Sequence, residues 1–317
     1  DLLLAGAPAL RMHAVTEALT AYARALPIAR DMPDGAADLL TIYTSRGRAL
    51  ELLSRFAEAK ENYEELETLA VARGDTRLEL EAVIGLGKLH ANVTPFYDPA
   101  RGRALMERAV GLAESVGDRV AEARILWNLV NIDRFDINSL DRAIANGERA
   151  VALARELELG EELAYLLNDL GELYGTVGRF ERADVLLREA RGHWTALGNE
   201  AMLADSLTSA AVWLHIAGDF AGALANAEEA YAITTRIDNI WGKAYSRSVR
   251  GEILSMTGEL GRALEDLTAG HDDAQRAGFV AGVILTDTFI AHLLLRLGDY
   301  AGAETRARTA LALAREQ

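Results

Sequence analysis

The chain contains no cysteine, only 5 prolines and only 6% aromatic residues among its 317 positions. Without cysteine, a disulfide framework, a thiolate metal site and a cysteine nucleophile are all excluded. This absence also fits a reducing compartment. Proline breaks helices, so its scarcity, together with the recurring Ala, Leu, Glu and Arg residues, favours a helical fold.

Long apolar runs and a basic N-terminal start are missing as well. No apolar stretch approaches the roughly 20 residues that a bilayer-spanning helix needs. The opening Asp1–Leu4 lacks the positive charge with which a signal peptide begins. We therefore predict a cytoplasmic protein. The first residue is not Met and the repeat pattern starts in mid-unit, so we expect a piece of a longer polypeptide.

The formal net charge of −15 bears on the class of partner. Binding to a phosphate backbone draws its affinity from clustered Lys and Arg side chains that displace counterions. A strongly acidic chain does not offer this, so we predict that nucleic acid is not a direct partner.

An internal repeat is the strongest signal in the sequence. The segment Gly178–Ala183 recurs as Gly218–Ala223, Gly258–Ala263 and Gly298–Ala303, each time 40 residues later. A further copy lies upstream at Ser54–Ala59. Such a period indicates a stack of similar units, each contacting its neighbours.

Each copy of the motif predicts a helix, a tight turn and a second helix. Gly178 suits a helix C-terminus because glycine takes left-handed dihedral angles without strain. Phe180 fills the angle between the helices, and Ala183 lets the two backbones approach closely. Gly stops followed by polar residues, as in Gly74-Asp75, Gly160-Glu161 and Gly198-Asn199, predict the junctions between pairs. We expect a partial first repeat over 1–35 and seven helix pairs over 36–317 that form one continuous superhelix, with helices of roughly 16 to 19 residues.

The segment Leu170–Tyr174, continued by Gly178, Phe180, Ala183 and Leu187, resembles the tetratricopeptide repeat (TPR). The resemblance covers nearly the whole chain, with a period of 40 residues in place of about 34. It implies an all-α fold, a right-handed α-solenoid of helix-turn-helix repeats in which the first helix of each pair lines a concave wall.

The 40-residue variant, with its opening at Ala5–Ala18, resembles the carboxy-terminal arrays of bacterial signal-transduction ATPases with numerous domains (STAND). That group includes the maltose-regulon activator and LuxR-type regulators. The resemblance implies a sensor or autoregulatory module that binds a protein or peptide segment, or a small-molecule inducer, with a nucleotide-binding domain upstream. The alternative is a free-standing scaffold that gathers protein partners through peptide segments.

Motifs for catalysis are missing. The tract Gly85–Lys88 lacks the spacing of a phosphate-binding loop and falls inside a predicted helix, where backbone amides are already bonded. The six histidines are far apart and have no partner at i, i+4 that would chelate a metal. Paired carboxylates such as Glu161-Glu162 fit a solvated helix face better than an acid–base pair. We predict no enzyme, no metal and no cofactor.

The TPR resemblance also implies which residues face a partner. Positions two before and two after the Leu of the Leu-Gly pair, and one turn further on, are expected to be exposed on the concave wall. A wall that mixes Tyr, Asn, Glu, His and Thr suits a recognition surface, and it fits an ordinary solvent-facing surface equally well. The candidates in the four later units are Tyr165, Asn168, Glu172, His215, Tyr245, Ser248, Glu252 and His292. Trp213 is predicted to pack between helices instead.

One unit departs from the repeat. The insertion Val93–Pro99 lengthens a turn, Asn131 stands where Gly is expected, and Arg134 stands where Tyr is expected. Departures from a packing pattern are places where function can override it. We therefore add Asn128 and Arg134 to the candidate binding residues and predict a specialised site within 93–136; neutral divergence is the alternative.

Overall fold

A computed structural model describes residues 15–32, 35–92 and 94–316. Every regular element in these residues is helical, and no strand occurs among them. The opening segments Asp1–Leu4 and most of Ala5–Ala18 lie outside the described residues. The α-helices are α2 Val15–Asp31, α3 Ala36–Leu52, α4 Phe56–Arg73, α5 Thr76–Ala91, α6 Pro99–Val116, α7 Arg119–Asp133, α8 Leu140–Glu156, α9 Gly160–Thr176, α10 Phe180–Leu197, α11 Glu200–Ile216, α12 Phe220–Arg236, α13 Ile240–Thr257, α14 Leu260–Arg276, α15 Val280–Leu297 and α16 Tyr300–Glu316. A 3-10 turn, Ile137–Ser139, precedes α8.

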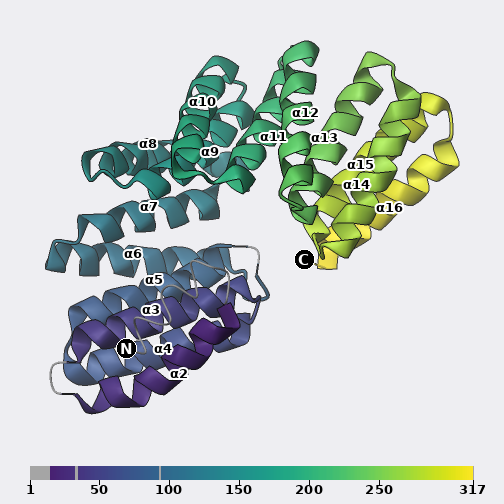
Figure 1. Ribbon diagram of the computed structural model, residues 1–317. Helices are drawn as coiled ribbons and strands as arrows, with labels where there is room; N and C mark the ends of the chain where they lie inside the picture. Colours follow the sequence, from purple (N-terminus) through teal and green to yellow (C-terminus); the bar gives the residue numbers. More distant parts are fainter. Residues whose placement is uncertain (1–14, 33–34, 93, 317) are drawn as a thin grey trace. The chain divides into compact units, whose positions relative to one another are not determined.

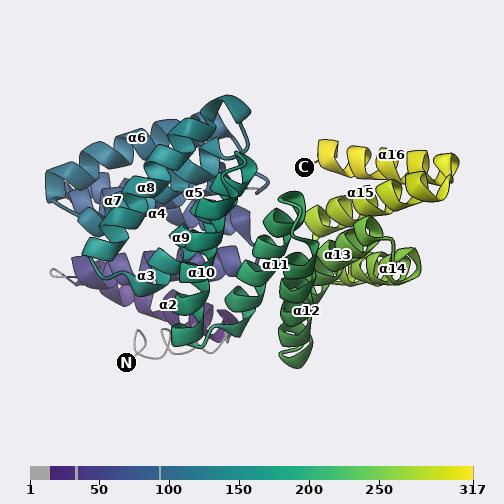
Figure 2. The same cartoon turned by 90° about the horizontal axis from the view of Figure 1, so that it is seen from above.

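The chain divides into two compact units, residues 1–153 and 154–317. In unit 2 the helices form successive pairs, α9 with α10, α11 with α12, α13 with α14 and α15 with α16. Figure 1 shows these pairs as antiparallel hairpins, and α15 and α16 lie side by side in Figure 2 as well. We call the first helix of each pair the A helix and the second the B helix.

The structure confirms most of the predicted helix starts and stops. Gly178 has φ of 75° and Gly198 has φ of 66°, so glycines occupy the left-handed position after a helix, as expected. Asp75 accepts hydrogen bonds from the backbone N–H groups of Arg77 and Leu78, and Asn199 accepts one from Met202. These side chains satisfy donors that a helix N-terminus leaves unpaired.

One predicted stop is wrong. Gly160 is the first residue of α9 and does not end α8. The left-handed position falls on Glu158, with φ of 55°. Ser54 and Asp238 hold equivalent positions with φ of 56° and 52°. Left-handed dihedral angles cost a residue with a β-carbon about 1–2 kcal/mol, so the fold imposes these turns even where glycine is absent.

Small residues set the close approach of helices within a pair. Ala183 is fully buried. A β-carbon at Gly171 would lie 2.8 Å from Cγ of Leu187, so only glycine lets α9 and α10 meet there. In unit 1 the tract Gly85–Lys88 lies within α5, and Gly85 faces the ring of Tyr63 on α4. The glycines of this tract therefore serve packing, as the sequence predicts.

Helix α15 is the most apolar helix of the described chain. Its 18 residues have a mean hydropathy of 1.7, enough by length and composition for a bilayer-spanning helix. Ile290 and Leu293 are nevertheless buried against Leu254, Ala263 and Leu267 of the preceding pair. Part of the apolar surface of α15 thus packs in the core of unit 2, while Leu295 and Leu297 are exposed.

Candidate functional site

The A helices of unit 2 form a continuous layer. α9 contacts α11, α11 contacts α13 and α13 contacts α15. Because the repeat is 40 residues long, equivalent positions on these helices form columns across the layer. We call the surface made by the columns that contain Tyr165, Asn168 and Glu172 the A-wall; its further members include Thr208, Val212, Tyr245, Ser248, Glu252, Thr288 and His292.

The structure corrects the expected exposure of several candidates. Asn168, Ser248 and Glu252 are buried, with exposed fractions of 4%, 1% and 8%. Tyr165, Glu172, His215 and Tyr245 are half-buried, and His292 is exposed. The expectation that all these positions face solvent is wrong because each A helix packs against the next A helix and covers part of the wall.

In the column of Asn168, hydroxyl groups are satisfied locally. Thr208 donates to the carbonyl oxygen of Ala204 at 2.9 Å, and Thr288 donates to that of Ile284 at 2.8 Å. Ser248 lies 2.6 Å from the hydroxyl of Thr286 on α15. Asn168 differs, because its buried Oδ1 has no hydrogen-bond partner within residues 15–32, 35–92 and 94–316. An unpaired acceptor of this kind is uncommon in a folded protein.

In the column of Glu172, two carboxylates meet different neighbours. Ser209 of α11 donates a hydrogen bond of 2.7 Å to Oε1 of Glu172. Nδ1 of His292 lies 3.7 Å from Oε1 of Glu252, while its Oε2 is buried and has no hydrogen-bond partner in the described part of the chain. Ser255, three residues further along α13, also has a buried hydroxyl for which the described residues provide no partner. Burial raises the pKa of the Glu252 carboxyl, and the nearby His292 and Arg296 act in the opposite direction.

Aromatic candidates pack mainly against their own pair. The ring of Tyr165 meets Trp194 of α10 edge-on at 4.7 Å between centroids, and Tyr245 lies 5.7 Å from Trp241. Half-burial lowers the pKa of His215, whose ring lies 5.9 Å from Phe220. Trp213 packs between helices as predicted.

In unit 1, the irregular segment forms a cleft. His90 Nδ1 lies 2.6 Å from the carbonyl oxygen of Phe96, and Thr94 donates to the carbonyl oxygen of Leu89 at 2.7 Å, so the inserted turn is tied to the end of α5. A cavity of about 240 Å³ opens beside this turn. It is lined by Tyr97, Pro99, Ala100, Arg103, Ile132, Asp133, Phe135, Asp136, Ser139 and Arg142.

A buried carboxylate holds that cleft together. Asp133 is 1% exposed and accepts hydrogen bonds of 2.8 and 2.7 Å from Nε and Nη2 of Arg142. Arg103 of α6 binds the same carboxylate. Beside it, Arg134 lies over the ring of Phe135 at 5.6 Å, and Phe135 is 67% exposed. Asn128 is buried and donates to the carbonyl oxygen of Arg124 at 2.8 Å, so its amide is already engaged.

A second cleft of about 360 Å³ lies among α6, α7 and α8 of unit 1. Leu126, Leu129 and Asn146 are among its lining residues. In regular pairs, the glycine of the Leu-Gly position lets the B helix approach closely; Asn131 replaces that glycine in α7.

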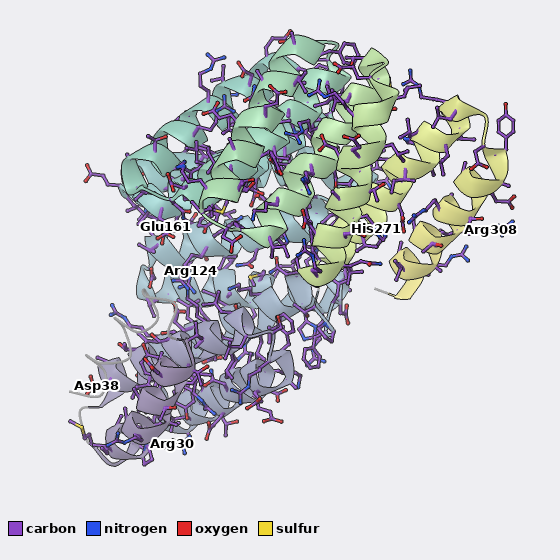
Figure 3. All side chains as sticks on the ribbon, turned by 45° about the vertical axis from the view of Figure 1, so that its right-hand side comes forward. Arg30, Asp38, Arg124, Glu161, His271 and Arg308 are labelled. Atoms are coloured by element: carbon purple, nitrogen blue, oxygen red, sulfur yellow. The ribbon has the colours of Figure 1, made fainter. Side chains whose placement is uncertain are left out.

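Sequence reasoning missed several contacts. Arg124 of α7, labelled in Figure 3, reaches back to Glu81 of α5, with Nη1 and Nη2 at 2.6 and 3.0 Å from its two carboxylate oxygens. Asp133 was not singled out either. For Ser209 the sequence does contain a signal. Ser209 stands 37 residues after Glu172, whereas the residue 37 positions after the equivalent Glu252 is Phe289, so the two repeats differ at this position.

No protein-family model and no curated protein matches the chain. Solved structures do. A Rap protein complexed with competence and sporulation factor shares 14% identity, with 99% of this chain and 97% of that chain covered and a TM-score of 0.67. The Rap conjugation gene regulator of the plasmid pLS20, in complex with the Phr peptide, shares 14% identity over 99% of this chain and 73% of that chain, with a TM-score of 0.58.

A STAND protein with a TPR sensor from Pyrococcus horikoshii also matches, at 14% identity over 93% of this chain and 52% of that chain, with a TM-score of 0.56. At these identities the likeness concerns the fold. The chain therefore has the fold of TPR-like helical repeat proteins, as the sequence motif predicts.

Proposed function

We propose that unit 2 binds an extended peptide segment along the A-wall. The observation that carries this proposal is the pair of unpaired buried groups in the wall, Asn168 Oδ1 on α9 and Glu252 Oε2 on α13. A buried polar group without a partner costs about 1–3 kcal/mol, and more when it is charged. A peptide supplies the missing donors through its backbone N–H groups and its side chains.

The spacing of the two groups suits an extended peptide. α9 and α13 are separated by one helix of the layer, α11. Neighbouring packed helices lie about 8–10 Å apart, so the two groups are on the order of 20 Å apart. An extended chain rises about 3.3 Å per residue, which makes a segment of roughly six residues long enough to reach both.

We also propose a role for the chain within a parent protein. The chain would be a sensor or autoregulatory module of a larger bacterial signalling ATPase or transcription regulator in the cytoplasm, without catalytic activity of its own. The match to a STAND protein with a TPR sensor supports this setting. The two Rap structures, solved in complex with a factor and with a peptide, support a peptide ligand. A nucleotide-binding domain in the sequence upstream of Asp1 would support this context, and its absence from the parent polypeptide would favour the free-standing scaffold.

Peptide binding is tested with mixed-sequence peptide pools. The chain is immobilised and exposed to hexapeptide and dipeptide pools of equal composition, and retained peptides are quantified by mass spectrometry. We expect hexapeptides to be retained and dipeptides to be lost. Asn168→Ala should weaken retention about fivefold, the effect of losing about 1 kcal/mol at an anchor.

The matched control is Asn226→Ala on the B helix α12, where the amide donates to the carbonyl oxygen of Gly222. This variant should retain hexapeptides like the wild type. Failure of the wild-type chain to retain hexapeptides would refute peptide binding. Retention that is unchanged in Asn168→Ala would move the contact away from this part of the A-wall.

A further inference from the structure

Two polar side chains lie about one helical turn apart on α13, and one of them, Glu252, belongs to the A-wall. Glu252 and Ser255 are 8% and 1% exposed, and among the described residues neither Oε2 of Glu252 nor the hydroxyl oxygen of Ser255 has a hydrogen-bond partner. Residues three apart on a helix share a face, so both groups belong to one patch of α13. On the facing helix α15, the side chain of His292 is 55% exposed.

The repeat shows why this patch is unsatisfied. The equivalent carboxylate Glu172 receives its hydrogen bond from Ser209, which stands 37 residues later. The residue 37 positions after Glu252 is Phe289, which packs into the apolar core formed with Leu254 and Ile290. Phenylalanine has no donor, so the protein does not supply at α13 the partner that it supplies at α9.

We propose that Glu252 and Ser255 receive a primary ammonium group of the peptide bound to the A-wall, either a lysine side chain or a free amino terminus. This inference rests on the proposed peptide binding. Oε2 of the Glu252 carboxylate and the hydroxyl of Ser255 are two buried acceptors without a partner among the described residues, and they match a compact cation with three donors.

The geometry favours an ammonium over a guanidinium. An arginine fork binds a carboxylate best through both oxygens at once. At Glu252 one of the two oxygens, Oε1, already faces His292 at 3.7 Å, which leaves Oε2 as the single free acceptor. An ammonium needs one carboxylate oxygen and can direct a second N–H to the hydroxyl of Ser255.

The test compares four hexapeptide pools on the full chain. One pool has a free amino terminus and no lysine, a second is N-acetylated and contains lysine, a third is N-acetylated and contains arginine in place of lysine, and a fourth is N-acetylated without either. We expect either the first or the second pool to be retained about tenfold more strongly than the third and fourth. Whichever of the two dominates identifies the source of the ammonium.

Glu252→Gln should abolish that preference while hexapeptides remain bound through the rest of the A-wall. The control Glu265→Gln removes the same charge from an exposed position on α14 and should keep the preference. Ser255→Ala should reduce the preference about threefold, which gives a second readout. Equal retention of all four pools, or a preference that persists in Glu252→Gln, would overturn the ammonium site yet leave peptide binding intact. Failure of every pool to bind would instead refute the proposed function.

Discussion

The indole ring of Trp213 covers Gly175 so closely that a β-carbon on Gly175 would overlap the ring. The two residues come from neighbouring A helices, α11 and α9. The glycine therefore sets how closely these two helices approach, and the layer that carries the A-wall depends on it.

Gly175→Ala should destabilise unit 2 although alanine is the better helix former. The gain in helix propensity is about 1 kcal/mol, whereas displacing a packed ring costs about 1–3 kcal/mol. We expect a net loss of up to about 2 kcal/mol in the free energy of unfolding, measured by urea denaturation. Gly192→Ala is the control, because a β-carbon there meets open space on α10, and it should stabilise the protein.

Ser54→Gly should stabilise unit 1. Ser54 has φ of 56°, a left-handed conformation that costs a residue with a β-carbon about 1 kcal/mol relative to glycine. Gly74 holds the same kind of position after α4, with φ of 64° and open space around it, so the reciprocal Gly74→Ser should cost a similar amount. Thermal melts of both variants check the direction of the two changes in stability. A destabilised Ser54→Gly would contradict the strain argument.

Asp133→Asn should weaken the cleft of the irregular unit. The neutral amide retains one acceptor oxygen where the carboxylate offers two to Arg103 and Arg142. Hydrogen bonds to charged groups contribute about 1.5–3 kcal/mol, so we expect a loss of about 2 kcal/mol. Asp141→Asn, at an exposed position of α8, should change the free energy of unfolding by less than about 0.5 kcal/mol. Equal effects of the two substitutions would show that the buried carboxylate does not stabilise this region.

Glu252 should make stability depend on pH. Burial raises the pKa of its carboxyl in the folded chain, against the opposing influence of His292 and Arg296. The folded protein therefore holds this proton more tightly than the unfolded chain does. The resulting stability is fully present below the unfolded pKa, about 4.3, and is lost as the pH rises through the raised folded pKa.

The measurement is the free energy of urea unfolding from about pH 4 upward, for wild type and Glu252→Gln. The wild type should lose stability relative to the variant as the pH increases over this window. If the wild type instead gained stability relative to Glu252→Gln as the pH rises, the folded protein would stabilise the carboxylate form of Glu252 more than the protonated form.

Much of the fold could be predicted because the recurring positions of the repeat act locally, at helix ends and at the contact within a helix pair. The glycine at Gly178, the cap at Asp75 and the alanine at Ala183 each act within a few residues or against the paired helix, and the structure has them in those roles. The predicted stop at Gly160 failed because the fold places the left-handed residue two positions earlier, at Glu158. Local residue preference is a weak constraint that tertiary context overrides.

The sequence by itself determined the helix pairs, their period and the columns in which Asn168, Glu172 and Glu252 fall, because these follow from spacing along one chain. Only the tertiary structure decided which of those side chains are exposed and which are paired. Glu172 and Glu252 occupy equivalent positions, yet Ser209 donates a hydrogen bond to the first, while the second keeps an oxygen that has no hydrogen-bond partner among the described residues. Hydrogen bonding depends on the residue that the neighbouring helix brings opposite, and that partner is set by packing between helices.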